Sequence, residues 1–245
     1  MRKVLFWPYQ LYAWLFFVPF TLVWSFICGW LAALAAVLVD PVFSSRYVGG
    51  AWARVIGWLT PMRVSIQGRQ NLDPRRTYVV VCNHVSQYDI LLVYGWLDLD
   101  LRWVMKQELR KLPGIGIACE KVGHIYIDRS NPEAARKSIN QALQRVGDGV
   151  GILFFAEGTR SLDGRLKRFK SGAFRVACDE QLPILPITIL GTRDILPAKS
   201  LRLFPGHATM VIHPPIEPAG RDVRELLDLT RAAIQSSLPD AAHPA

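Results

Sequence analysis

A histidine and an aspartate five residues apart are the residues of this chain best suited to acid–base chemistry. His84 and Asp89 follow the apolar run 78–82, which is typical of a buried strand. An imidazole can take a proton from a hydroxyl group, and a carboxylate can hold the imidazole in the orientation that this transfer requires. The pair therefore predicts a site that activates a hydroxyl nucleophile.

The spacing of this pair restricts where the two residues can lie. Five residues turn through about 500° on a regular helix, so the two side chains cannot meet on one helical face. They can meet if His84 lies in a loop and Asp89 lies in the first turn of a helix. Residues 86–89 fit a capping box, with Ser86 as the N-cap and Asp89 as the acid at N3. The alternative is that Asp89 only caps the helix and His84 only packs, and the motif alone leaves both open.

A second polar segment follows another apolar strand. The turn 157–161 follows the run 152–155, and ligands of open α/β sheets bind at the carboxyl ends of strands. Gly158 permits a tight turn, the Thr159 hydroxyl can donate, and the Arg160 guanidinium is matched to phosphate. In isolation the same segment would be an ordinary turn with one solvated arginine.

Further basic residues indicate an anionic ligand near that turn. Arg129 ends a strand-like segment and could bind phosphate or simply pair with Asp128, and Lys106 is a weaker candidate cation. A basic run after the turn is either a solvated face or an anion-attracting rim beside Arg160. The run comprises Arg165, Lys167, Arg168, Lys170 and Arg175.

The elements that must position these residues alternate between strand-like and helix-like segments. Several strands are continuous runs of Val, Ile and Leu, as expected for strands that are buried on both faces. The alternation predicts an α/β fold with a mostly parallel central sheet flanked by helices. The predicted strands are 63–67, 77–82, 101–105, 125–127, 152–155, 184–190 and 209–213. The predicted helices are 86–97, 132–146, 171–178 and 222–238, the second with Asn131 as its N-cap and Pro132 at its first position.

An apolar segment precedes the sheet. Residues 4–39 contain no Lys, Arg, Asp or Glu and are rich in Trp and Tyr, which collect at membrane interfaces. As one helix this segment would be about 54 Å long, against a hydrocarbon core of about 30 Å. Pro8 and Pro19 predict a kink or break, and Pro41 predicts its end. We therefore expect an N-terminal membrane-associated helical element.

Three arrangements of this element fit the sequence. One is a single tilted span over about residues 20–39, and another is a hairpin or two-helix element that dips into one leaflet. A cleaved signal peptide, cut near residues 33–35, is disfavoured because the apolar run far exceeds the usual core of about 7–15 residues. Arg2 and Lys3 favour a cytoplasmic N-terminus, so a single span would place the catalytic part outside the cytoplasm and a hairpin would keep it inside. The four unpaired cysteines suit a reducing compartment and favour the hairpin.

Composition limits the partners and the domain organisation. The 245 residues carry a formal net charge of +9, which indicates an anionic partner such as acidic lipid or a phosphorylated substrate. Nucleic acid is disfavoured, because a long apolar segment has no role in binding it. The cysteines form no metal-ligand cluster, and nucleotide and serine-hydrolase motifs are missing from the sequence. We expect a membrane-embedded or membrane-surface helical segment over 1–60, an α/β catalytic domain over 61–240 and a tail over 241–245.

Four segments resemble, in order and in spacing, the sequence blocks of the glycerolipid acyltransferases of the 1-acylglycerol-3-phosphate acyltransferase type. Any one block is a modest signal, but four in order are specific. Tyr126 stands where phenylalanine is usual and Ala156 where proline is usual, and neither departure touches the acid, base or arginine positions. The blocks are Asn83-His84 with Asp89 after four residues, 123–129, 155–161 and 182–187.

The resemblance implies transfer of an acyl group from a thioester to a glycerolipid hydroxyl, with acyl-ACP or acyl-CoA as co-substrate and with no cofactor or metal ion. It implies the 2-hydroxyl of 1-acylglycerol 3-phosphate as the acceptor, phosphatidate as the product, and a membrane location with the catalytic domain on the cytoplasmic face. In this hypothesis His84, oriented by Asp89, is the general base, and donors near Ser86 stabilise the oxyanion. The substrate-binding residues are Glu157, Gly158, Thr159, Arg160, Arg129 and Lys106.

Two other functions remain open. An acyltransferase for another lysolipid, such as lyso-ornithine lipid or a lysophospholipid, would carry the same motifs, although the basic rim favours a phosphate acceptor. A non-catalytic protein that binds membrane surfaces would require His84 and Asp89 to be purely structural, which the full set of motifs disfavours.

Overall fold

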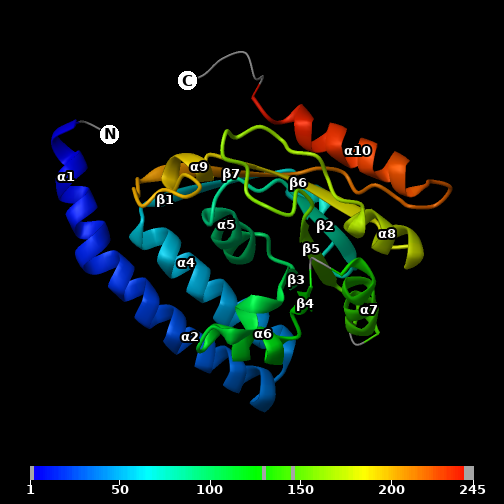
Figure 1. Cartoon of the computed structure of the whole chain (residues 1–245), viewed down its shortest axis with the longest axis horizontal. Helices are drawn as coiled ribbons and strands as arrows, with labels where there is room; N and C mark the ends of the chain where they lie inside the picture. The colour runs from blue at the N-terminus through cyan, green and yellow to red at the C-terminus, as the bar shows by residue number, and fades with distance from the viewer. Residues whose placement is uncertain (1–2, 129–130, 145–146, 240–245) are drawn as a thin grey trace.

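A seven-stranded sheet forms the centre of the molecule (Figure 1). The structure is a computed structural model and describes residues 3–128, 131–144 and 147–239. The strands are adjacent in the order β1-β7-β6-β2-β5-β3-β4, and all adjacent pairs are parallel except β6 and β7. The predicted α/β fold with a mostly parallel sheet is confirmed. The strands are β1 (Met62–Gln67), β2 (Tyr78–Cys82), β3 (Asp100–Lys106), β4 (Ile125–Ile127), β5 (Val150–Phe155), β6 (Ile184–Leu190) and β7 (Gly206–Ile212).

Helices cover both faces of the sheet. Alternate residues of a strand point to opposite faces, so Val80 and Cys82 of β2 join one core and Val79 and Val81 join the other. Burial on both faces is the reason why the central strands are continuous apolar runs. The first face is covered by α4 (Gly50–Leu59), α5 (Tyr88–Trp96) and α9 (Thr192–Ile195), and the second by α7 (Pro132–Leu143), α8 (Gly172–Asp179) and α10 (Val223–Ser236).

The predicted strands and helices are all present, with ends that differ by a few residues. The side chain of Asn131 accepts a hydrogen bond from the N–H of Ala134 at 3.0 Å and caps α7, as predicted. The predicted end of that helix at Val146 and the predicted tail 241–245 lie outside the described residues. The predicted helices do not include α6 (Ile115–Val122).

The N-terminal segment is helical without interruption. It comprises α1 (Lys3–Tyr12), a π-helical segment η1 (Ala13–Phe17) and α2 (Val18–Leu38). The chain therefore does not break at either proline: Pro8 is contained within α1, and Pro19 lies at the first positions of α2, directly after the π-helical segment. Residues 5–38 form one helix that is long and apolar enough to cross a membrane.

Pro41 begins a new helix rather than only ending the first one. Asp40 accepts a hydrogen bond from the N–H of Phe43 at 2.8 Å and caps α3 (Pro41–Phe43). The chain continues through the π-helical segment η2 (Ser44–Gly49) into α4. The N-terminal element is thus formed by two consecutive helical stretches, 3–38 and 41–59.

The long N-terminal helix is attached to the α/β domain along its length (Figure 1). Near its start, the Gln10 amide exchanges hydrogen bonds with the backbone of Leu203 at 2.6 and 3.2 Å. In its middle, Ser25 accepts from the Trp52 indole at 2.9 Å. Further along, Gly29 packs closely on Gly114. A Cβ atom at Gly29 would lie 2.6 Å from the carbonyl carbon of Gly114. The helix therefore lies alongside the domain and does not project away from it.

Candidate active site

The site lies at the carboxyl ends of two neighbouring strands. The chain leaves β2 through α5 on one face of the sheet and leaves β5 through α8 on the other face. Such a switch of direction opens a crevice beyond the strand ends, where ligands of open α/β sheets bind. His84 follows β2 and Glu157 follows β5, so the fold brings the two polar segments to one place.

The carboxylate of Asp89 is fully buried and engaged on both oxygens. Oδ2 accepts hydrogen bonds from His84 Nδ1 at 2.7 Å, Val85 N–H at 2.7 Å and Ser86 N–H at 2.9 Å. Oδ1 accepts from the hydroxyl of Thr192. His84 lies in the loop and Asp89 in the first turn of α5, which is the arrangement that their spacing requires. Four donors hold the carboxylate in one orientation.

The helix start agrees with the predicted capping box in part: Asp89 accepts from the Ser86 N–H, as predicted, whereas the Ser86 hydroxyl accepts from Tyr88 N–H and not from Asp89 N–H. The N-cap of α5 is Gln87 and not Ser86. The Ser86 hydroxyl accepts from Tyr88 N–H at 3.1 Å and donates to Leu196 O at 2.7 Å, forming a local turn one residue earlier. Asp89 takes the N–H groups of Val85 and Ser86, and the Ser86 hydroxyl is also occupied, so these three donors are not available to an oxyanion.

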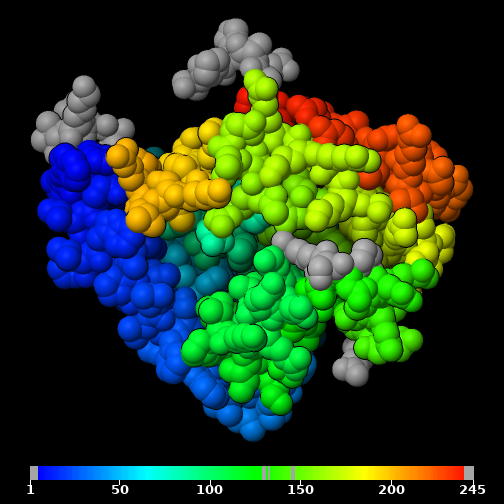
Figure 2. Space-filling model, in the orientation of Figure 1, coloured from blue at the N-terminus to red at the C-terminus, as the bar shows by residue number. Residues whose placement is uncertain are grey.

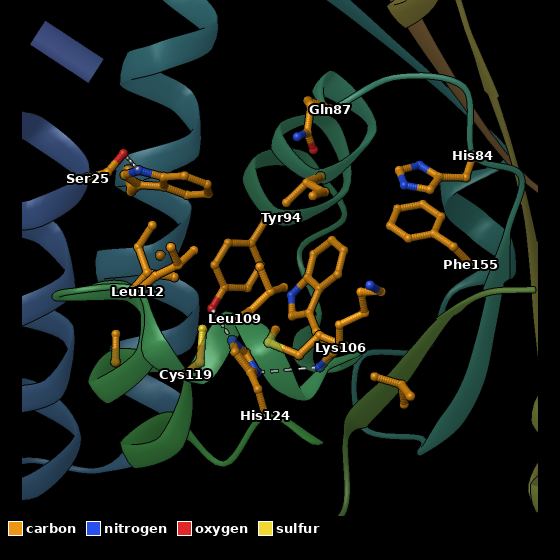
Figure 3. A pocket seen from close by; sticks show the side chains of 18 of the residues that line it. Ser25, His84, Gln87, Tyr94, Lys106, Leu109, Leu112, Cys119, His124 and Phe155 are labelled. Carbon is orange, nitrogen blue, oxygen red and sulfur yellow. Dashed lines mark hydrogen bonds between the residues drawn. The ribbon is translucent and has the colours of Figure 1, made fainter. Parts of the chain in front are cut away.

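Hydrogen bonding fixes the state of the His84 imidazole. A carboxylate only accepts hydrogen bonds, so Nδ1 bears a proton, and in the neutral ring Nε2 is the nitrogen that can accept one. The ring stacks on Phe155 with its centroid at 3.8 Å and an interplanar angle of 12°. The side chain is only 14% exposed. The hydrogen bond to Asp89 and the stacking on Phe155, which Figure 3 shows beside His84, orient the imidazole and leave Nε2 as the reactive atom.

Glu157 joins the two loops of the site. Its buried carboxylate accepts from the N–H of His84 at 2.8 Å and from the N–H of Lys167 at 3.0 Å, and its burial raises its pKa. The Ser161 N–H donates to His84 O at 2.8 Å. The Asn83 amide pairs with both backbone groups of Ile189 at 2.7 and 2.9 Å. The backbone of His84 is therefore fixed from β5 and from β6.

A cavity of about 660 Å³ begins at His84 and extends beneath the surface. Its mouth is polar, and its body is apolar and lies between α2, α4, α5, β3 and α6. Figure 2 shows a hollow on this face, bordered by the segment after α9, the loop after β5, and the region of η4 (Gln107–Lys111) and α6. The mouth contains His84, Gln87, Lys106, Thr159, Arg160 and Lys199, and the body includes Ala32, Trp52, Ile90, Tyr94, Ala118 and His124.

The structure brings most of the predicted site residues together. Gly158, Thr159, Arg160 and Lys106 line the same cavity as His84, whereas Glu157 lies behind the turn with both oxygens taken by backbone N–H groups. The Lys106 ammonium group lies 3.6 Å from the Glu108 carboxylate, with which it forms an ion pair. Arg129 lies outside the described residues. The described part of the chain has no group of three or more His, Cys, Asp or Glu side chains that could hold a metal ion.

Several residues of the site have no signal in the sequence. Lys199 lines the mouth with a left-handed backbone (φ 64°), and it lies outside the basic run. The contact between Thr192 and Asp89 joins residues 103 positions apart. Among these residues, Phe155 could have been predicted from the sequence. It ends the strand before the turn, and the alternation of side chains along that strand would place it on the same face of the sheet as His84.

Comparisons with known proteins agree with this arrangement. The sequence profile of the family described as Acyltransferase matches residues 63–190. A 1-acyl-sn-glycerol-3-phosphate acyltransferase of Chlamydomonas reinhardtii is 33% identical over 228 residues, covering 88% of this chain and 68% of the relative. The human alpha enzyme of the same name is 32% identical over 218 residues, covering 84% and 77%. A chloroplastic 1-acyl-sn-glycerol-3-phosphate acyltransferase of Brassica napus is 34% identical over 196 residues, covering 79% of this chain and 56% of the relative.

A solved structure has a similar fold over nearly the whole chain. It is the crystal structure of the 1-acyl-sn-glycerophosphate (LPA) acyltransferase, PlsC, from Thermotoga maritima. The TM-score is 0.81, the sequences are 26% identical, and the match covers 96% of this chain and 95% of the other. The N-terminal helices are therefore included in the likeness.

Proposed function

This chain belongs to the 1-acyl-sn-glycerol-3-phosphate acyltransferase family, and from that premise we propose that it acylates the 2-hydroxyl of 1-acylglycerol 3-phosphate from a thioester donor, giving phosphatidate. The observation that carries the proposal is the 2.7 Å contact between His84 Nδ1 and the buried Asp89, at the mouth of a cavity that also holds Arg160. It combines a base, a group that orients the base, and a cation for phosphate.

The reaction needs one base and no covalent enzyme intermediate. The Nε2 atom of His84 takes the proton of the acceptor hydroxyl while the hydroxyl oxygen attacks the thioester carbonyl carbon. Asp89 stabilises the imidazolium that forms. The tetrahedral intermediate then collapses with cleavage of the C–S bond, and His84 returns the proton to the departing sulfur. The products are the ester and a free thiol, with acyl-ACP or acyl-CoA as the donor.

The cations at the mouth suit a phosphate group. Arg160 presents a bidentate donor, and Lys106 and Lys199 line the same mouth. We assign the acceptor phosphate to Arg160, with Lys106 and Arg129 assisting. Glu157 and Gly158 shape the turn, and Lys167 braces it by donating to Thr159 Oγ1 at 2.9 Å. Binding of the phosphate at this point would bring the neighbouring hydroxyl of the glycerol towards His84.

The apolar body of the cavity fits an acyl chain. It lies between the N-terminal helices and the sheet, and its walls are aliphatic and aromatic side chains. Each methylene that leaves water for such a site contributes about 0.8 kcal/mol. A chain that enters from the mouth would carry the carbonyl carbon or the glycerol to His84.

We assign the N-terminal helices to one leaflet of the membrane, with the α/β domain on the cytoplasmic side. The helix over 5–38 would be about 51 Å long, more than the hydrocarbon core, and its contacts at Gln10 and Gly29 bind it alongside the domain. Its outer surface is apolar, with exposed side chains that include Trp7, Trp14, Phe16, Leu22, Trp30 and Leu38. A helix that lies in the leaflet would present the cavity mouth to membrane lipids.

Acyl transfer from a labelled acyl thioester by the purified protein in detergent tests the proposal. The acceptors are 1-acylglycerol 3-phosphate, glycerol 3-phosphate and lyso-ornithine lipid, with His84→Ala as the blank. We expect labelled phosphatidate from the first acceptor alone. Product from lyso-ornithine lipid alone would keep the chemistry and change the acceptor, and no product that depends on His84 would contradict catalysis.

A further inference from the structure

A second groove meets the catalytic turn from the other side of the sheet. It has a volume of about 480 Å³ and lies between α7 and α8, beyond the carboxyl ends of β3, β4 and β5. Its lining shares Val104, Phe155 and Gly158 with the cavity described above. Phe155 is the residue that stacks on His84. The two hollows therefore share the residue that is in contact with the His84 ring.

The groove combines an apolar floor with a cationic rim. Ile127, Phe154 and Val176 contribute to the floor. The charged lining comprises Arg136, Lys170 and Arg175 together with the carboxylates of Asp128 and Asp179. The Arg136 guanidinium lies 3.6 Å from the Asp179 carboxylate. Neither Lys170 nor Arg175 forms an ion pair within the part of the chain that the structure describes. The Lys170 side chain lies across Gly158, since a Cβ there would be 2.8 Å from its Cε. A long flexible ligand with an anionic end fits this combination.

The groove opens on the part of the molecule that faces away from the N-terminal helices. Figure 1 shows α7 and α8 across the sheet from α1 and α2. The exposed large apolar side chains are concentrated on the N-terminal helices, and within the described residues of α7 and α8 there are none. A water-soluble reactant would therefore reach the site through the groove, while a lipid would enter at the cavity mouth.

We propose that this groove holds the 4′-phosphopantetheine arm of the acyl donor, with the sulfur end at Phe155 and the phosphate end at Lys170 and Arg175. The proposal rests on the proposed acyltransferase function and adds the route of the donor. The arm is common to coenzyme A and to acyl carrier protein. It is slender, carries two amides along an alkyl chain, and ends in a phosphate, which the apolar floor and the cationic rim match.

Filling the groove tests the route of the arm. Gly172, at the start of α8, lines the groove, and a Cβ there would meet no atom within 4 Å, so the first atom of the Gly172→Leu side chain has room. We expect the KM for acyl-CoA and for acyl-ACP to rise about tenfold or more, which corresponds to about 1.4 kcal/mol. The KM for 1-acylglycerol 3-phosphate and turnover of an acyl-N-acetylcysteamine thioester, which lacks most of the arm, should stay unchanged.

Matched controls separate obstruction from misfolding. Gly147→Leu adds the same side chain at another glycine with open space, outside the groove, and should leave all KM values unchanged. The thermal unfolding midpoint of each variant shows whether it is folded. The wild-type protein, assayed first with both donors, reveals which donor it prefers, and lack of any wild-type turnover would count against the proposed function and not against the groove.

Removing the rim charges tests the phosphate end. Lys170→Gln with Arg175→Gln should raise the KM for acyl-CoA and acyl-ACP but not for acyl-pantetheine, which has no phosphate. Lys137→Gln is the control, since Lys137 is exposed on α7 but does not line the groove. If the KM rises for acyl-ACP alone, the two cations contact the carrier protein and not the phosphate of the arm, and the proposed phosphate contact is wrong. If Gly172→Leu raises the KM of the lipid acceptor, or changes neither KM, the groove does not carry the donor.

Discussion

At the scale of single residues, the orientation of the His84 imidazole depends on Asp89. In Asp89→Asn, the amide has one accepting oxygen for three N–H donors and the Thr192 hydroxyl. If the amide nitrogen faces the imidazole, Nδ1 must accept and Nε2 carries the proton, so the base is lost. We expect kcat to fall by about 10²–10⁴-fold, the range of general acid–base catalysis, with KM for both substrates nearly unchanged. Steady-state kinetics measures this, and a retained kcat would remove the orienting role.

Arg160 allows a test of phosphate recognition that leaves the base untouched. Charge-assisted hydrogen bonds contribute about 1.5–3 kcal/mol, so Arg160→Ala should raise the KM for 1-acylglycerol 3-phosphate about 10–100-fold. The KM of the donor should not change. Arg168→Ala is the matched control, because Arg168 is an exposed residue of the same basic segment that lines neither cavity. Equal effects of the two variants on KM would indicate general attraction by positive charge and not a specific contact.

At the scale of elements, the sequence predicted what is encoded locally. Strands such as β2 and β6 are short, mostly apolar runs, and the helix α7 begins with a recognisable cap, so both types of element were predicted. The N-cap of α5 was placed one residue too early, because a serine hydroxyl can serve a turn as well as a helix. Contacts such as Thr192 with Asp89, and the groove between α7 and α8, depend on residues that only the fold brings together. The antiparallel pairing of β7 also has no local signal.

The contact of α2 with the domain depends on the small size of one residue. A Cβ at Gly29 would lie 2.6 and 2.7 Å from the carbonyl carbon and oxygen of Gly114, and the backbone cannot yield as a flexible side chain can. We expect Gly29→Ala to destabilise the protein by about 1–3 kcal/mol, as overpacking does, although alanine favours helix. Gly50→Ala adds the same methyl group to α4 with its nearest neighbour at 3.8 Å, so it should be neutral or stabilising. Thermal unfolding compares them, and an unaltered midpoint for Gly29→Ala would mean that α2 moves freely.

At the scale of the whole molecule, apolar surface and positive charge together predict membrane binding. Leu15 and Phe16 are 64% and 68% exposed on the N-terminal helix, whereas Leu229 is 39% exposed on α10 across the sheet. Burying one such side chain contributes about 1.5–3 kcal/mol, so Leu15→Ser with Phe16→Ser should weaken partition to anionic vesicles about 100-fold or more. Leu229→Ser should bind like the wild-type protein. Co-sedimentation with vesicles measures this, and equal loss in both variants would contradict insertion through the N-terminal helix.

The acid stability of the molecule reflects imidazoles that the fold keeps neutral. Burial lowers the pKa of His124 to about 3, and burial also lowers the pKa of His213. In the unfolded chain both would titrate near pH 6.5. At a pH between the pKa of the folded state and that of the unfolded state, the unfolded chain binds more protons than the folded protein. The stability that these two histidines contribute is therefore fully present above about pH 6.5, and it is lost as the pH falls towards the pKa values of the folded state.

A substitution at His124 isolates its part of this dependence. Acidic groups that also weaken at low pH, such as Asp163, whose pKa is lowered mainly by a hydrogen bond from Ser161, remain in both proteins and cancel in the comparison. Between pH 7.5 and 4.5 the unfolding midpoint of His124→Gln should therefore fall less steeply than that of the wild-type protein. The two proteins should differ most in slope below pH 6.5. Parallel curves would mean that His124 becomes protonated in the folded protein, with water reaching it through the cavity.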